Sequence, residues 1–250
     1  GALPAYKRLV GPNQWPDPSA CPGFRPAVEE FMAEMEGLSR LVMAGLAECM
    51  GLPPAYFDPT FGDEPNVQMK VARYPPPPEG ADGWSGVGAH SDSGYLSLLL
   101  QDTAGGLQVL NGAGEWVDAP PIPGTLVVNL GEMLQLVTGG FYLATVHRVQ
   151  NRGPTERVSV PYFWNPRLDA RIEPMPEEVL AGLPWARPRP AAGYSATHGG
   201  RNKVLPVYGD NAFKSLYRSH PRVVAAHHAD LELQEDGRYA PAPPRAAEGS

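Results

Sequence analysis

The sequence predicts a mainly β protein with flanking helices, in which the strands form a sandwich or a barrel. Short apolar segments recur at close spacing between residues 66 and 163, and no clear helix separates them, which argues against a parallel α/β sheet. Glycine (28 residues) and proline (30 residues) punctuate these segments, as tight turns require. Apolar residues make up 42% of the 250-residue chain, enough for one large domain or two small ones.

The N-terminal part predicts an irregular arm followed by one long helix. Residues 1–23 contain five prolines and are expected to form an extended arm without regular structure. Residues 24–50 carry apolar side chains at spacings of three and four, and Gly51 is a natural C-terminal stop. The positions expected to face the core are Phe31, Met35, Leu38, Val42, Leu46 and Cys49.

From residue 66 the apolar period changes to two, as in a half-buried strand. We expect further strands over residues 95–101, 107–110, 115–118, 125–129, 145–151 and 157–163. Residues 131–138 are ambiguous between a short helix and a strand. Short helices are expected over residues 210–217 and 221–229, and a disordered tail over residues 233–250. The expected organisation is one domain over residues 24–232 with a β core at about 66–166.

Composition excludes several classes of partner. The formal net charge is −7 and no dense lysine and arginine cluster is present, so we expect no nucleic-acid binding. No apolar run approaches the ~18 residues that a membrane span needs, and we expect no signal peptide. The two cysteines, Cys21 and Cys49, do not make a disulfide framework, and Cys49 is expected to be a buried thiol. A reducing cytoplasm fits these features.

Three residues form a candidate metal site. His90 and Asp92 are two positions apart, which on a strand places both side chains on one face, and His147 follows 55 residues after Asp92 on another expected strand. Two imidazoles and one carboxylate suit iron(II) when the site must keep open positions, although zinc could bind the same set. A single histidine in an apolar run is more often an ordinary core or surface residue. The other histidines lack strand context, and the pair at 227 and 228 predicts a solvated helix face.

A candidate anion site follows the third of these residues. Arg157 lies ten residues after His147, and Ser159 lies two further on, so both point the same way on a strand. A guanidinium holds a carboxylate through two parallel hydrogen bonds, and a nearby hydroxyl adds a third. Alone, the pair would be an ordinary surface arginine with a strand serine. Beside a metal site it predicts an anchor for the far end of a keto acid.

At this point the sequence resembles the 2-oxoglutarate and iron(II)-dependent oxygenases of the isopenicillin N synthase-like group, in their bacterial form. The matching segments lie in order along the chain: GPNQWPD (11–17) and the helix after it, MKVARYPPPP (69–78), GAHSDSGYLSLLLQDTAGGLQV (88–109), PGTLVVNLGEMLQLVTGG (123–140), TVHRVQNRGPTERVSVPYFWNP (145–166) and, more weakly, YGDNAFKSLYRSHP (208–221).

This resemblance implies a double-stranded β-helix, or jelly roll. It implies that His90, Asp92 and His147 bind the iron, that Arg157 and Ser159 hold the distal carboxylate of 2-oxoglutarate, and that Tyr74 contacts the co-substrate or the substrate. The implied cofactors are iron(II), 2-oxoglutarate as co-substrate and O2, with ascorbate as an accessory reductant. The N-terminal segment of the family is not recognisable here, and we expect that it is missing.

Three functional hypotheses remain open. The leading one is a dioxygenase that hydroxylates, desaturates or cyclises a small organic molecule and releases succinate and CO2. An iron(II) oxidase that needs no 2-oxoglutarate, as in isopenicillin N synthase itself, is the alternative, and an inactive jelly-roll binding protein is the second alternative. Candidate walls of the substrate pocket are Leu98, Phe163 and Trp164, although apolar strand residues more often belong to the core.

Overall fold

The computed structural model describes residues 3–78, 85–151, 153–185 and 204–242. The chain gathers into two compact units, one of residues 16–166 and 173–196 and a smaller one of residues 1–15, 167–172 and 197–250. The single domain expected over residues 24–232 stays a prediction, since its bounds run through both units. Among the described residues, no helix is both long and apolar enough to cross a membrane.

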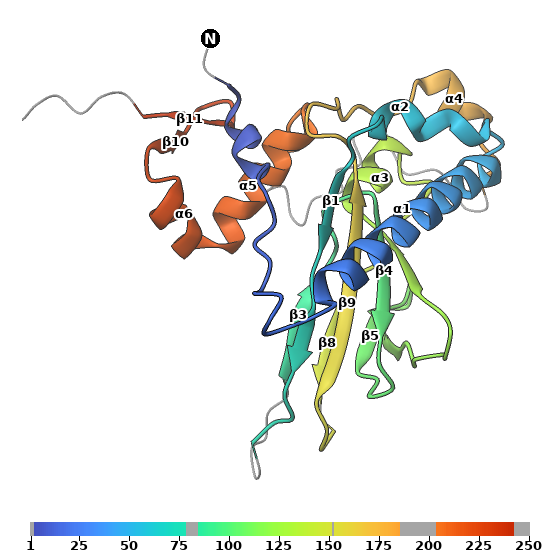
Figure 1. Cartoon of the computed structure of the whole chain (residues 1–250). Coiled ribbons are helices and arrows are strands. Elements are labelled where there is room, and N and C mark those ends of the chain that lie inside the picture. The colour runs from blue at the N-terminus through green and yellow to red at the C-terminus, as the bar shows by residue number, and fades with distance from the viewer. Residues whose placement is uncertain (1–2, 79–84, 152, 186–203, 243–250) are drawn as a thin grey trace, which may run out of the picture. The chain divides into compact units, whose positions relative to one another are not determined.

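The larger unit is built on two antiparallel sheets (Figure 1). The first has the order β1 (Asn66–Met69), β9 (Arg157–Asn165), β4 (Leu96–Gln101) and β7 (Val127–Leu130), and β2 (Ala72–Tyr74) also pairs with β9. The second has the order β3 (Ser85–His90), β8 (His147–Asn151), β5 (Leu107–Leu110) and β6 (Trp116–Asp118). From β3 to β9 the chain passes back and forth between the two sheets, which is the topology of a double-stranded β-helix. The predicted fold class is confirmed.

The side chains of strand β9 alternate between the two faces of the first sheet, and both faces are buried. Arg157 and Ser159 are buried on one face, and Tyr162 and Trp164 are buried on the other. Phe61 stacks on the Trp164 ring with centroids 5.4 Å apart. The first face looks toward the second sheet, since Arg157 donates a hydrogen bond to the carbonyl of Gly105, just before β5.

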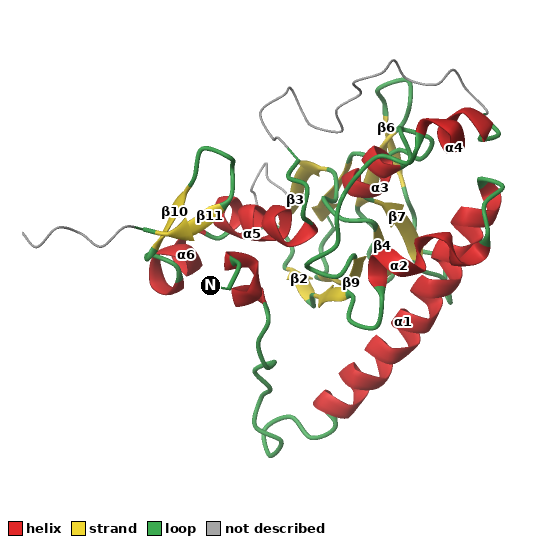
Figure 2. Ribbon diagram, turned by 90° about the horizontal axis from the view of Figure 1, so that it is seen from above, coloured by secondary structure: helices red, strands yellow, loops and turns green. Residues whose placement is uncertain are grey.

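Helix α1 (Phe24–Cys49) covers the outer face of the first sheet beside β9 and β4, as Figures 1 and 2 both show. The predicted helix is confirmed, but the buried row runs through Met35, Ser39, Met43 and Ala47. Cys49 is exposed, so its prediction as a buried thiol is wrong. Each helical residue turns the side chain by about 100°, so a residue two positions after Ala47 points almost directly away from the sheet.

Short helices complete the larger unit: η2 (Pro54–Phe57, a 3-10 helix), α2 (Asp58–Phe61), α3 (Glu132–Val137) and α4 (Glu177–Gly182). The ambiguous residues 131–138 are therefore helical. Gly131, just before α3, approaches the chain so closely that a Cβ there would lie 2.1 Å from the carbonyl oxygen of Gly94. Only glycine allows this approach, which brings the start of α3 against the loop between β3 and β4.

The smaller unit contains η1 (Ala5–Leu9, a 3-10 helix), α5 (Tyr208–Ser219), α6 (Pro221–His227) and a hairpin of β10 (Leu231–Leu233) and β11 (Tyr239–Pro241). The two predicted helices are confirmed. The prediction that residues 1–23 lack regular structure is wrong for Ala5–Leu9, which form η1 with Tyr6 packed against Gly209 and Arg8 paired with Asp230.

Two further predictions in this unit are wrong. β10 and β11 occupy part of the expected disordered tail, because Tyr239 stacks on Tyr217 with centroids 3.7 Å apart. His228, expected on a solvated face, is buried against the Phe213 ring. His198 lies outside the described residues.

Candidate metal centre

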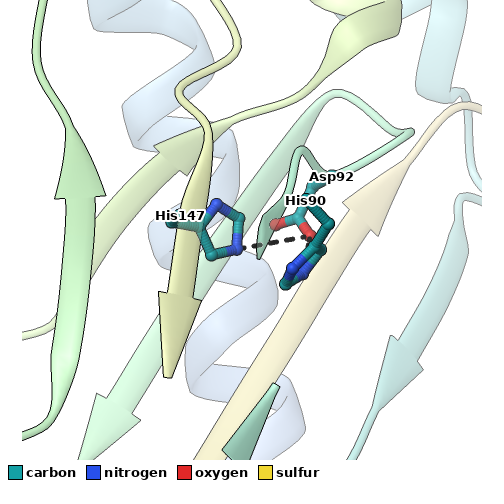
Figure 3. Close-up of side chains that lie close together, drawn as sticks. All are labelled: His90, Asp92 and His147. Atoms are coloured by element: carbon teal, nitrogen blue, oxygen red, sulfur yellow. Dashed lines mark ion pairs between the residues drawn. The ribbon is translucent and has the colours of Figure 1, made fainter. Parts of the chain in front are cut away.

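The two imidazoles of the predicted site meet across neighbouring strands. His90 is the last residue of β3 and His147 is the first of β8, and the register of this antiparallel pair sets them opposite each other. A register shift between Val87 and His90 accommodates this pairing. The ring centroids are 4.3 Å apart. Figure 3 shows both side chains and that of Asp92 pointing toward one another.

The carboxylate of Asp92 completes the cluster. Its Oδ1 lies 3.8 Å from Nε2 of His90 and 3.8 Å from Nε2 of His147. The three donor atoms all lie within 4.8 Å of one another, so the group could hold a metal ion. The prediction that His90 and Asp92 share one face of a strand is wrong, because β3 ends at His90 and Asp92 follows in the loop before β4. The turn of this loop brings Asp92 to the histidines.

Backbone carbonyls orient both imidazoles. Nδ1 of His90 lies 2.8 Å from the carbonyl oxygen of Gly88, and Nδ1 of His147 lies 3.0 Å from that of Thr145. A carbonyl oxygen can only accept, so each Nδ1 carries the proton and donates it. Each Nε2 then presents its lone pair to the centre, which is the tautomer that a metal ligand requires.

Two side chains that sequence reasoning missed hold the other oxygen of Asp92. Oδ2 accepts a hydrogen bond from the Ser97 hydroxyl at 2.8 Å and one from the Asn129 amide at 2.7 Å. The backbone oxygen of Asp92 accepts from the Glu132 amide at 2.8 Å. The available signal was two polar residues within apolar strands, at positions whose neighbours are aliphatic.

Arg157 and Ser159 lie together on β9, as predicted. The Arg157 side chain is fully buried and donates to the Gly105 carbonyl at 2.7 Å, to Ser159 Oγ at 3.1 Å and to Gln101 Oε1 at 3.3 Å. Tyr74, directly opposite Arg157 in the β2–β9 register, has its ring centroid 5.1 Å from the guanidinium carbon. Gln101, opposite Ser159 in the β4–β9 register, is a fourth member that the sequence analysis missed.

The electrostatics of this cluster favour an anion. Burial lowers the pKa of the Arg157 guanidinium, while Tyr74 and Asp102 act in the opposite direction. An arginine keeps its proton despite such a shift. The acceptors Gly105, Ser159 and Gln101 are neutral groups, so none of these three hydrogen bonds pairs the guanidinium with a carboxylate. A carboxylate that binds here would form a direct, hydrogen-bonded ion pair with the guanidinium.

The candidate pocket walls divide between the two faces of the first sheet. Phe163 pairs with Ser97 across β9 and β4, so it lies on the face that looks toward Asp92. Leu98 and Trp164 alternate with those residues and are fully buried on the opposite face, beneath α1. Leu98 and Trp164 are therefore core residues, the more common role of apolar strand residues, and Phe163 alone of the three candidates lies on the face of the site.

Comparison with known proteins matches this site to one family. Residues 66–166 match the model of the 2OG-Fe(II) oxygenase superfamily. A "2-oxoglutarate-dependent dioxygenase" of Gibberella zeae is 33% identical over 273 residues, covering 98% of this chain and 70% of that protein. The "2-oxoglutarate-dependent dioxygenase frbJ" of Dothideomycetidae sp. is 43% identical over 185 residues, covering 71% of this chain. The chain spans 50% of the length of that second relative.

A solved structure agrees. JOX2, crystallised "in complex with 2OG, Fe, and JA", superposes with a TM-score of 0.61 at 31% identity, covering 69% of this chain and 50% of that one. The matched region of the family model contains the two sheets from β1 to β9 and all three residues of the metal cluster. The chain belongs to the 2OG-Fe(II) oxygenase superfamily.

Proposed function

We propose that this protein is an iron(II)- and 2-oxoglutarate-dependent dioxygenase that oxidises a small organic molecule and releases succinate and CO2. The observation that carries the proposal is the convergence of two imidazole Nε2 atoms and one carboxylate oxygen, together with the buried Arg157 on the same sheet as the Ser97 that holds Asp92. The names of the relatives point the same way.

The donor set fits iron(II). Two neutral nitrogens and one anionic oxygen leave half of an octahedral coordination sphere for other ligands, as an oxygen-activating centre needs. His90 and His147 would bind through Nε2, and Asp92 through Oδ1. When bound, iron(II) supplies the redox chemistry that couples oxidation of 2-oxoglutarate by O2 to oxidation of the substrate. The protein positions the reactants and limits the access of water.

The cluster around Arg157 would hold the co-substrate. Arg157 and Ser159 would bind its distal carboxylate, with Tyr74 against the guanidinium and Gln101 fixing its orientation. Ser97, which contacts Asp92, and Gln101, which contacts Arg157, are four residues apart on β4. Four residues of strand span about 13 Å, which leaves room for a dicarboxylate between the two sets of side chains.

Finer assignments are part of the same proposal. We place the chain in the isopenicillin N synthase-like group on its motifs, and propose its bacterial branch, although the two relatives named above are fungal. We propose a small-molecule substrate, no nucleic-acid partner, and a cytoplasmic location in keeping with two free cysteines. Phe163, which is half-buried on the face of the site, would contribute to the substrate pocket.

A coupled assay tests the proposal. The protein is loaded with iron(II) and 2-oxoglutarate without oxygen, candidate substrates are added, O2 is admitted, and succinate is measured. We expect succinate from the parent protein and from the His220→Ala control, whose histidine is exposed in the smaller unit, but none from His147→Ala. Equal succinate from the parent and His147→Ala would refute the proposal. Turnover without 2-oxoglutarate would favour the oxidase alternative, and failure to bind iron(II) would favour the inactive one.

A further inference from the structure

We propose that Ser97 and Asn129 form a positioning pair that sets the metal affinity of the centre and restricts Asp92 to one ligand oxygen. The inference rests on the proposed function, because it concerns the same metal. It adds two residues of the first sheet to a centre whose histidines both lie on the second.

The geometry separates the two oxygens of Asp92. Oδ1 faces Nε2 of both histidines at 3.8 Å, whereas Oδ2 accepts the Ser97 hydroxyl at 2.8 Å and the Asn129 amide at 2.7 Å. The orientation of the Asn129 amide is settled by chemistry, because an ionised carboxylate only accepts hydrogen bonds and so must face the NH2 group. Oδ2 is thus occupied by the protein, and Oδ1 is left for the metal.

The pair is held together before any metal arrives. Ser97 and Asn129 are directly opposite each other in the β4–β7 register, and the Asn129 amide also lies 3.3 Å from Ser97 Oγ. Asn129 precedes α3, whose first residue, Glu132, binds the backbone oxygen of Asp92. The short stretch from the end of β7 to the first residue of α3 therefore fixes Asp92 through both its side chain and its backbone.

Loss of these two donors would have two consequences. The carboxylate would lose the charge-assisted bonds that hold its rotamer, so more entropy would be lost on metal binding. It could also rotate and offer both oxygens to the metal, which would occupy a coordination position that the co-substrate or oxygen needs. Outer-sphere partners of this kind typically contribute 10- to 100-fold to metal affinity, and we expect an effect of about that size here.

The test measures metal binding rather than turnover. Mn(II) and Co(II) are titrated into the full chain by calorimetry, and the visible spectrum of the Co(II) form reports its coordination number. Asn129→Leu keeps a similar volume but removes the amide, and we expect its metal affinity to fall by roughly 10- to 100-fold with an altered Co(II) spectrum. Val128→Thr is the matched control, since the neighbouring side chain faces the other side of the sheet and is 50% exposed.

A second pair of variants covers the case in which Asn129→Leu does not fold. Ser97→Ala removes the hydroxyl and should weaken metal binding, whereas Ser97→Thr keeps it and should restore the affinity. The inference is overturned if Asn129→Leu or, should that variant not fold, Ser97→Ala binds Mn(II) as tightly as the parent with the same Co(II) spectrum. Failure of the parent itself to bind either metal would instead refute the proposed function, so the two failures can be told apart.

Discussion

Replacement of Arg157 by methionine is the sharpest test of the co-substrate site. Methionine fills much of the same volume but removes the guanidinium, which is fully buried and held by Gly105, Ser159 and Gln101. None of the proposed metal ligands belongs to Arg157, so its removal should leave the affinity for Mn(II) nearly unchanged. The affinity of Arg157→Met for 2-oxoglutarate should be much lower than that of the parent protein.

The magnitude follows from the burial of the pair. Removing one partner of a buried, hydrogen-bonded charge pair costs about 2–5 kcal/mol. At about 1.4 kcal/mol for each factor of ten, this is a roughly 30- to 4,000-fold weaker Kd. Because Arg157 is 0% exposed, no solvent can replace the lost bonds, and we expect the upper half of that range.

Lysine at the same position separates charge from geometry. Arg157→Lys keeps the positive charge but cannot form two parallel bonds to a carboxylate while also reaching the Gln101 and Gly105 oxygens. We therefore expect 2-oxoglutarate affinity between those of the parent and of Arg157→Met.

The assay is calorimetric titration of 2-oxoglutarate into the Mn(II)-loaded protein without oxygen, preceded by a Mn(II) titration of each variant. Succinate, which also has carboxylates but lacks the keto group that would chelate the metal, is titrated as a comparison ligand. Binding of 2-oxoglutarate by Arg157→Met as tightly as by the parent, with Mn(II) affinity unchanged, would refute the reasoning. Parallel loss of both affinities would show instead that Arg157 is structural.

Three further predictions concern the metal, the backbone and pH. His147→Ala should lower Mn(II) affinity, measured by calorimetry, by more than the roughly 10- to 100-fold that an outer-sphere partner contributes. Gly131→Ala should lower the free energy of unfolding by about 1–3 kcal/mol in denaturant titrations, because the new Cβ would clash with the backbone of Gly94. Gly37 lies on α1 with open space around it, so the control Gly37→Ala should raise the free energy of unfolding by up to about 1 kcal/mol. Burial, then Arg8 and His227, lower the pKa of His228, so below its ordinary 6.5 the unfolded chain binds a proton that the folded chain does not. Stability should fall as pH drops from 6.5 to the lowered pKa, and His228→Phe should flatten that part of the pH–stability curve; an unchanged curve would contradict the assignment.

Local pattern was sufficient for much of the fold and of the centre. The period of two along residues 157–163 placed Arg157 and Ser159 on one face, and both are buried there. The helix over residues 24–49 was evident from its apolar spacing and from Gly51. Donor chemistry, the expected strands and the family resemblance together selected the two histidines and Asp92, since imidazole and carboxylate groups suit an iron(II) site.

Errors arose wherever a residue's surroundings come from distant parts of the chain. The apolar stripe of α1 did not reveal that Ser39 and Ala47 face the sheet while Cys49 faces away. The hairpin near residue 240 looked disordered because the aromatic partner of Tyr239 is on α5. Only the strand register separated the three candidate wall residues, with Leu98 and Trp164 in the core beneath α1 and Phe163 on the face of Asp92.

The sequence by itself determined which functional groups the centre uses and the order in which they follow along the chain, since these are properties of residue type and local periodicity. The tertiary structure decided how those groups are arranged. The β3–β8 register sets His90 opposite His147, the loop after β3 turns Asp92 toward them, and β4 and β7 bring Ser97 and Asn129 to its second oxygen. Such pairings depend on which strands become neighbours, and hydrogen bonds between strands far apart in the chain form only when the two sheets assemble.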